Sequence, residues 1–100
     1  MSSAHRQFLS ANSPHLTHCM DPRYGMIPLM IEHRVISYRD SERILCYQTS
    51  SAMNEFILRL LARKPDSSFQ KFISVLEESN QSHVLTNCYG KNKQEDNGKL

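Results

Sequence analysis

The feature that most constrains the fold is a regular spacing of apolar residues between positions 50 and 64. Apolar side chains recur there every three or four residues, at Met53, Phe56, Ile57, Leu60 and Leu61. This spacing places them on one face of an α-helix and predicts that the face is buried. Thr49 or Ser50 can cap the start, because a hydroxyl accepts a hydrogen bond from a first-turn amide. Pro65 predicts the end of the helix, since proline cannot continue it.

Two further helices are predicted in the carboxyl-terminal half. The first follows Pro65 and Asp66 directly, and its apolar face consists of Phe69, Phe72, Ile73 and Leu76. Because the connection is so short, the helices on its two sides must be neighbours. The second is predicted over residues 81–89, with Val84, Leu85 and Cys88 on one face and Gly90 as its left-handed cap. Residues 91–99 are polar throughout, so residues 91–100 are predicted to be a disordered tail or linker.

Proline interrupts the first predicted helix. Its apolar stripe consists of Phe8, Leu9, Leu16, Cys19 and Met20. Ser13 and Pro14 fall inside this stripe, where a proline removes one amide donor and clashes with the preceding turn. We therefore expect the helix to bend there, or to restart with Ser13 as the cap and Pro14 as its first residue.

The remaining helices complete an all-α domain. Pro28 lies in an apolar stretch that predicts a helix starting near Met26, where a first-turn proline costs little. Ser37 and Asp40 have the spacing of a cap before a further helix at Ile44. The count is six helices. The chain has 100 residues, of which 39% are hydrophobic and 22% are charged. This length and composition, together with the six helices, predict a single domain over residues 1–90.

No catalytic, cofactor-binding or metal-binding residue is expected. Cys19, Cys46 and Cys88 form no C-x-x-C pair and cannot close a complete disulfide set, so we expect reduced and mostly buried thiols. His15, His18 and Cys19 lie close together but lack the fourth ligand of a structural zinc site. The chain also lacks a G-x-x-x-x-G-K-[ST] phosphate loop and the Gln-Ala-Cys signature of a caspase.

Membranes and nucleic acids are not the expected partners. No stretch approaches the roughly 18 apolar residues of a membrane span, and the first residues do not resemble a signal peptide, so a cytoplasmic protein is expected. The net charge of +2 is far below the excess typical of proteins that bind phosphate backbones. A helix-turn-helix protein that contacts phosphates stays open as an alternative. Its contact residues would be Arg59, Arg63, Lys64 and Lys71.

A charged face lies opposite the apolar face of the helix at 50–64. Glu55, Arg59 and Arg63 follow one another at four-residue intervals, which favours a Glu55–Arg59 pair and brings the two arginines together. One interpretation is a solvated helix face, as most charge runs are. We favour a contact surface, because the arginine fork pairs with carboxylates in a two-pronged geometry.

Three stretches resemble the caspase recruitment domain (CARD) of the death-fold superfamily. Residues 30–37 resemble the end of the family's second helix and the cap of its third. Residues 53–72 resemble its fourth helix, tight turn and fifth helix, and residues 76–85 resemble its passage into the last helix. Arg34 stands where many members have glycine. The resemblance implies a six-helix antiparallel Greek-key bundle with a kinked or broken first helix.

The resemblance also implies a function. Family members are non-catalytic modules that assemble homotypically with another CARD-containing protein, such as a caspase, an adaptor or an apoptosome-type protein. The implied basic face consists of Arg6, Arg59, Arg63 and Lys64. The implied acidic face consists of Glu32, Asp40 and Glu42. Charge complementarity between such faces sets partner choice and association rate more than total affinity.

Several roles stay open at this level. The chain can be an adaptor or a CARD-only decoy that regulates caspase activation in apoptotic or inflammatory signalling. It can equally be the amino-terminal recruitment domain of a caspase or an apoptosome protein. Self-association or a filament is also possible, because contacts between two different faces need not close into a ring.

Overall fold

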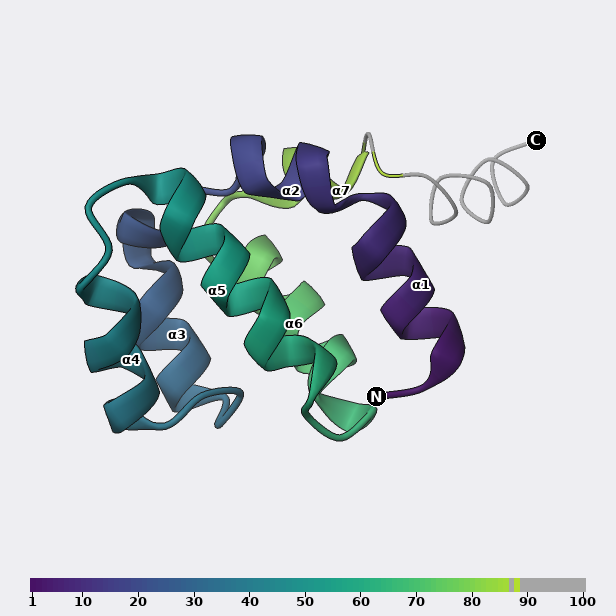
Figure 1. Ribbon diagram of the computed structural model, residues 1–100, viewed down its shortest axis with the longest axis horizontal. Coiled ribbons are helices and arrows are strands. Elements are labelled where there is room, and N and C mark those ends of the chain that lie inside the picture. Colours follow the sequence, from purple (N-terminus) through teal and green to yellow (C-terminus); the bar gives the residue numbers. More distant parts are fainter. Residues whose placement is uncertain (87, 89–100) are drawn as a thin grey trace.

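The computed structural model describes residues 1–86 and 88, which form helices and no β-strand (Figure 1). The all-α prediction is therefore confirmed for the described part of the chain. The elements are α1 (Ser3–Ala11), α2 (Ser13–Cys19), the kinked turn η1 (Pro22–Met26), α3 (Ile27–Glu32), α4 (Tyr38–Leu45), α5 (Ser50–Ala62), α6 (Ser67–Glu78) and α7 (Ser82–Thr86). The predicted cap at Gly90 and the predicted tail at 91–100 lie outside the described residues.

The described residues contain seven α-helices, where the sequence predicted six. The difference lies at the amino terminus, where one helix that bends or restarts at Pro14 was expected and the structure has two α-helices, α1 and α2. Asn12 separates them with φ −103° and ψ 8°, and it takes the cap position expected for Ser13. Pro14 lies in the first turn of α2, where its missing amide costs little.

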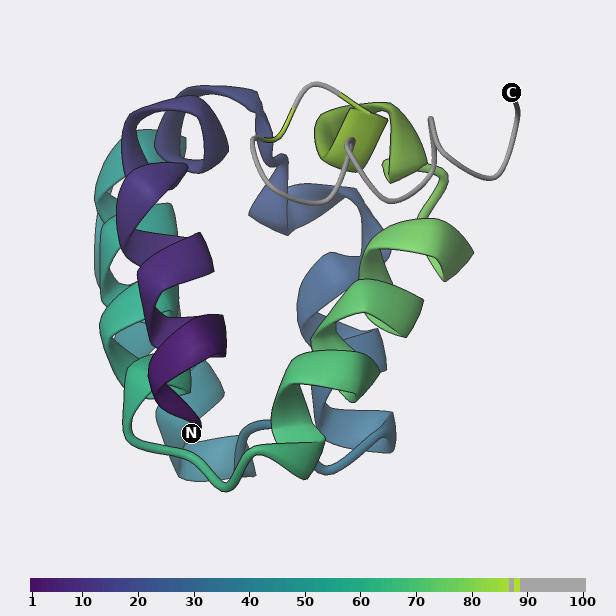
Figure 2. The same cartoon turned by 90° about the vertical axis from the view of Figure 1, so that its right-hand side faces the viewer.

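Helix α5 is the centre of the bundle, since α1, α2, η1 and α4 all pack against it. Figure 2 shows α1 and α5 on one side of the molecule and α6 on the other. Phe56 and Leu60 are only partly buried, whereas Leu58, outside the predicted apolar face, is buried. The largest fully buried side chains include Phe72, Leu16, Met26, Met30, Ile44, Met53, Ile57, Leu61 and Leu76.

The residues predicted to cap or begin a helix lie at the starts of α3, α4 and α5. Thr49 caps α5, and its hydroxyl accepts a hydrogen bond from the Ala52 amide at 3.1 Å. Ser37 and Asp40 form a reciprocal capping box on α4: the Asp40 amide donates to the Ser37 hydroxyl at 3.0 Å, and the Ser37 amide donates to the Asp40 carboxylate at 3.1 Å. Pro28 lies in the first turn of α3, as expected. These caps fix where each chain segment turns into the bundle.

Two helices end in a left-handed residue that is not glycine. After α3, Arg34 has φ +62°, and its amide donates to the Ile31 carbonyl at 2.9 Å. The next amide, that of Val35, donates to the Met30 carbonyl at 2.8 Å, which completes a Schellman motif. Asn80 has φ +63° and ends α6 with the same pattern of hydrogen bonds. Glycine adopts this left-handed conformation without the steric cost that a side chain has there.

Asn54 joins α5 to the end of α2. Its side chain is fully buried, and its Nδ2 donates to the Thr17 carbonyl at 2.9 Å and to the Met20 carbonyl at 3.0 Å. Carbonyls at the end of a helix have no partner within the helix. Asn54 therefore satisfies backbone groups that the core would otherwise bury without a hydrogen bond.

Replacing Arg34 with glycine should stabilise the fold. The left-handed backbone costs an arginine about 1–2 kcal/mol, and glycine loses part of this gain through its larger entropy in the unfolded chain. We expect Arg34→Gly to raise the free energy of unfolding by about 0.5–1 kcal/mol, measured by urea denaturation. The same exchange in helix α4, Arg43→Gly, should lower it by about 1 kcal/mol. A lower free energy of unfolding in Arg34→Gly would contradict the claim that the backbone at Arg34 is strained.

Removing the side-chain amide of Asn54 should destabilise the core. Asn54→Ala leaves the buried Met20 carbonyl and the partly buried Thr17 carbonyl without their donor, which should lower the free energy of unfolding by about 1–2 kcal/mol. The neighbouring exposed residue provides the control, since Glu55→Ala should change stability by less than about 0.5 kcal/mol. Equal effects of the two substitutions in thermal or urea unfolding would show that the hydrogen bonds of Asn54 do not matter.

Candidate protein-interaction surface

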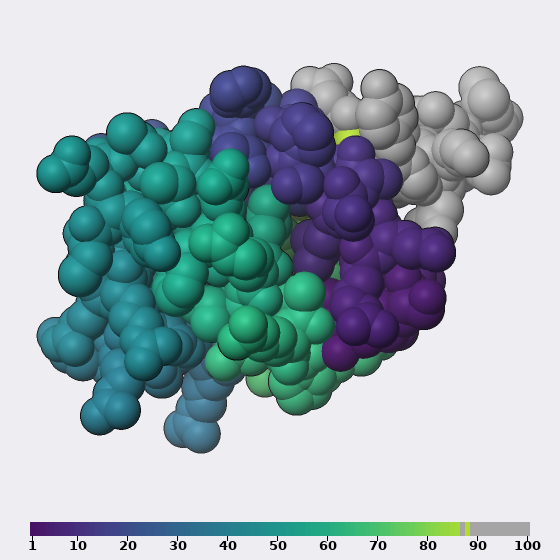
Figure 3. Space-filling model, in the orientation of Figure 1, coloured from purple at the N-terminus to yellow at the C-terminus, as the bar shows by residue number. Residues whose placement is uncertain are grey.

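A groove of about 420 Å³ lies between α1 and α5. Figure 3 views this side of the molecule, where the purple atoms of α1 meet the green atoms of α5. Leu9 and Leu58 contribute apolar surface and are 4% and 8% exposed. The full lining consists of Arg6, Leu9, Ser10, Ser13, Glu55, Leu58, Arg59 and Ala62. The groove thus combines apolar side chains with charged ones.

The groove brings together two of the predicted basic residues. Arg6 lies on α1 and Arg59 on α5, and both are exposed. Neither guanidinium forms an ion pair with any residue in the described part of the chain. The expected Glu55–Arg59 pair is also not formed among these residues, although Glu55 lines the same groove. Both guanidinium groups are therefore available to an external carboxylate.

The other two predicted basic residues lie beyond the groove lining. Arg63 is the exposed residue that ends α5. Lys64 follows it, and its Nζ lies 3.6 Å from a carboxylate oxygen of Asp40. A residue predicted for the basic face is thus paired with one predicted for the acidic face of the same molecule.

Asp40 has two roles inside the protein. It caps α4 and pairs with Lys64, and its side chain is only 16% exposed. Partial burial acts to raise the pKa of Asp40, but the hydrogen bonds from Ser37 and the charge of Lys64 outweigh it and lower the pKa below its ordinary value. The carboxylate is therefore ionised and already paired at neutral pH, which reduces its availability to a partner.

The surface of α3 and α4 has mixed charge. Glu32 and Glu42 are exposed, as expected for an acidic face. Three exposed arginines share this surface: Arg34, Arg39 and Arg43. Since Asp40 is paired with Lys64, the arginines outnumber the free carboxylates. The sequence resemblance placed acidic residues here but did not include their basic neighbours.

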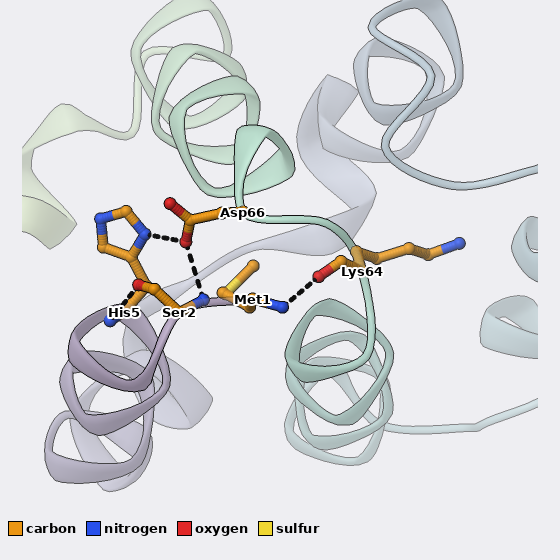
Figure 4. A network of polar contacts seen from close by, with 5 residues as sticks. All are labelled: Met1, Ser2, His5, Lys64 and Asp66. Carbon is orange, nitrogen blue, oxygen red and sulfur yellow. Dashed lines mark hydrogen bonds and ion pairs between the residues drawn. The ribbon is translucent and has the colours of Figure 1, made fainter.

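A polar network holds the start of α1 near the start of α6 (Figure 4). Asp66 accepts a hydrogen bond from the Ser2 amide at 2.8 Å, and the same oxygen lies 2.5 Å from Nδ1 of His5. The amino group of Met1 donates to the Lys64 carbonyl at 2.7 Å. The spacing of residue types along the sequence could not predict these contacts, because each joins residues more than 60 positions apart.

Aromatic contacts reinforce this network and position the groove. The His5 ring stacks on Phe69, with ring centroids 3.9 Å apart and planes 7° apart. Phe8 meets the edge of Phe69 at a centroid distance of 5.5 Å. Arg6 lies between His5 and Phe8 in α1, so these contacts fix the helix that carries it.

One contact joins a cysteine to a histidine, since Sγ of Cys19 lies 3.4 Å from Nδ1 of His15. Cys88 is buried, as predicted, but Cys19 and Cys46 are exposed. Cys46 was expected on a buried face, and it is exposed because α4 ends at Leu45 and Cys46 only caps it. Nε2 of His15 contacts the Val84 carbonyl at 2.8 Å. Within the described residues no group of three or more His, Cys, Asp or Glu side chains is placed to hold a metal ion.

The helix lengths address whether the chain can cross a membrane, and the positions of the cations address whether it binds nucleic acid. Among the described residues, no helix has both the length and the apolar character needed to cross a bilayer. Of the four cations of the helix-turn-helix alternative, Lys64 is paired with Asp40 and Lys71 lies on α6 rather than α5. No specific observation favours the nucleic-acid alternative.

The Asp66 network predicts a pH dependence of stability. Hydrogen bonds from the Ser2 amide and the His5 side chain lower the pKa of Asp66 to about 2. An unfolded aspartate has a pKa of about 3.9, so ionised Asp66 stabilises the fold above about pH 4, and this contribution disappears as the pH falls toward 2. Urea midpoints of the wild type and Asp66→Asn should therefore differ at pH 5 and converge toward pH 2. A constant difference would contradict this role.

Comparison with known proteins identifies the family. A family model described as the caspase recruitment domain matches residues 6–88. Domains of this kind are non-catalytic modules that bind other such domains in apoptotic and inflammatory signalling. Comparisons with curated proteins and with solved structures gave no match. Because the family model covers most of the sequence, the chain belongs to the caspase recruitment domain family.

Proposed function

We propose that this CARD binds an acidic surface of another CARD-containing protein through its α1–α5 groove. It acts in the cytoplasm as an adaptor or as a decoy that regulates caspase activation. The observation that carries this proposal is the placement of Arg6 and Arg59 on the same groove, without an ion pair inside the described part of the chain.

The chemistry of the groove fits a partner's carboxylates. A guanidinium group presents several N–H donors in one plane and binds a carboxylate through two hydrogen bonds. The almost fully buried side chains of Leu9 and Leu58 give the groove a small apolar floor next to these charges. Arg63 extends the positive charge beyond the groove. Such a site favours a helical surface with carboxylates next to small apolar side chains.

Charge reversal tests this proposal directly. Binding of the purified protein to a panel of immobilised CARDs should identify at least one partner, and Arg59→Glu should weaken that binding at least tenfold. This factor corresponds to a loss of about 1.4 kcal/mol, below the typical cost of breaking a buried charge pair. Lys71→Glu provides a matched control, because it makes the same charge change at an exposed position on α6.

The control variant should bind like the wild type. Circular dichroism should show the same helical content in all three proteins, because Arg59 and Lys71 are exposed. Equal affinity of Arg59→Glu and the wild type would rule out the groove as the binding surface. Equal weakening by both variants would show a general effect of net charge rather than a contact at the groove.

A further inference from the structure

The two surfaces that could meet in self-assembly carry the same sign of charge. The α1–α5 surface has Arg6, Arg59 and Arg63 against Glu55. The α3–α4 surface, described above, has three arginines against two unpaired glutamates. Placing one surface on the other would bring like charges together, which disfavours association. The pairing of Asp40 with Lys64 within one molecule removes a carboxylate that could have reversed this balance.

Apolar contact area is available on the α3–α4 surface. Tyr38 and Leu45 lie one at each end of α4 and are 71% and 56% exposed. Their spacing of seven residues places them on the same side of the helix. A lack of apolar area therefore does not prevent a second copy from binding at this surface. The charge of the approaching surface therefore determines whether the groove binds a second copy or an acidic partner.

We infer that the occupant of the α1–α5 groove is an acidic surface of a different protein, and that a bound molecule ends the assembly instead of extending it. This inference rests on the proposed function, because it assigns the partner of the same groove. The α1–α5 surface supplies the basic half of a charged interface, and in the described part of the chain the α3–α4 surface does not supply a matching acidic half to a second copy. A filament made only of this chain is therefore not expected.

Analytical ultracentrifugation of the wild type, Arg59→Glu and two charge variants of α4 tests this inference without any partner. The wild type should remain monomeric in about 0.1 M salt, where charges interact over roughly 10 Å. Arg39→Glu combined with Arg43→Glu makes the α4 surface acidic at two exposed positions, and this variant should self-associate. Adding Arg59→Glu should restore the monomer, since it removes a positive charge from the groove. About 1 M salt should also restore it, because screening shortens the range to roughly 3 Å.

Two results would overturn the inference. Self-association of the wild type that is lost in Arg59→Glu would show that a second copy already fits the groove. A monomeric acidic variant with wild-type helical content would show that the charge of α4 does not decide whether copies associate. Failure of the proposed function has a different signature, because a groove that binds none of the CARDs in the panel can still leave the wild type monomeric and the acidic variant associated.

Discussion

The structure depends on the burial of one face of α5. Met53, Ile57 and Leu61 are almost fully enclosed, and the same helix packs against α1, α2, η1 and α4. Burying side chains of this size contributes roughly 1.5–3 kcal/mol each, so this face holds together the helices that pack on α5. Since α5 also carries Leu58 and Arg59, the packing that forms the core also sets one side of the groove.

Polar contacts inside the molecule decide which charges remain available to a partner. The capping box and Lys64 engage Asp40, and the Ser2 amide and His5 engage Asp66. Neither Arg6 nor Arg59 is engaged in this way within the described residues. The number of cations in the sequence therefore does not by itself define the basic surface. The surface consists of the cations that are not paired with a carboxylate of the same molecule.

Local features of the sequence predicted much of the fold. The spacing of apolar residues located α5 and α6, and Thr49 and the Ser37–Asp40 pair marked two helix starts, because these signals act within a few residues. The division at Asn12, the Asp40–Lys64 pair and the Asp66 network could not be predicted this way. They depend on tertiary contacts or on backbone angles that residue spacing does not encode.

The most direct test of the central claim is nuclear magnetic resonance of the isotope-labelled protein during titration with a CARD that binds it. The account predicts that the largest changes in chemical shift occur in α1 and α5, including the side-chain Nε–H signals of Arg6 and Arg59. It also predicts small changes across α3 and α4. Largest changes at Glu32, Glu42 and their neighbours, with the two arginine signals unmoved, would contradict the account.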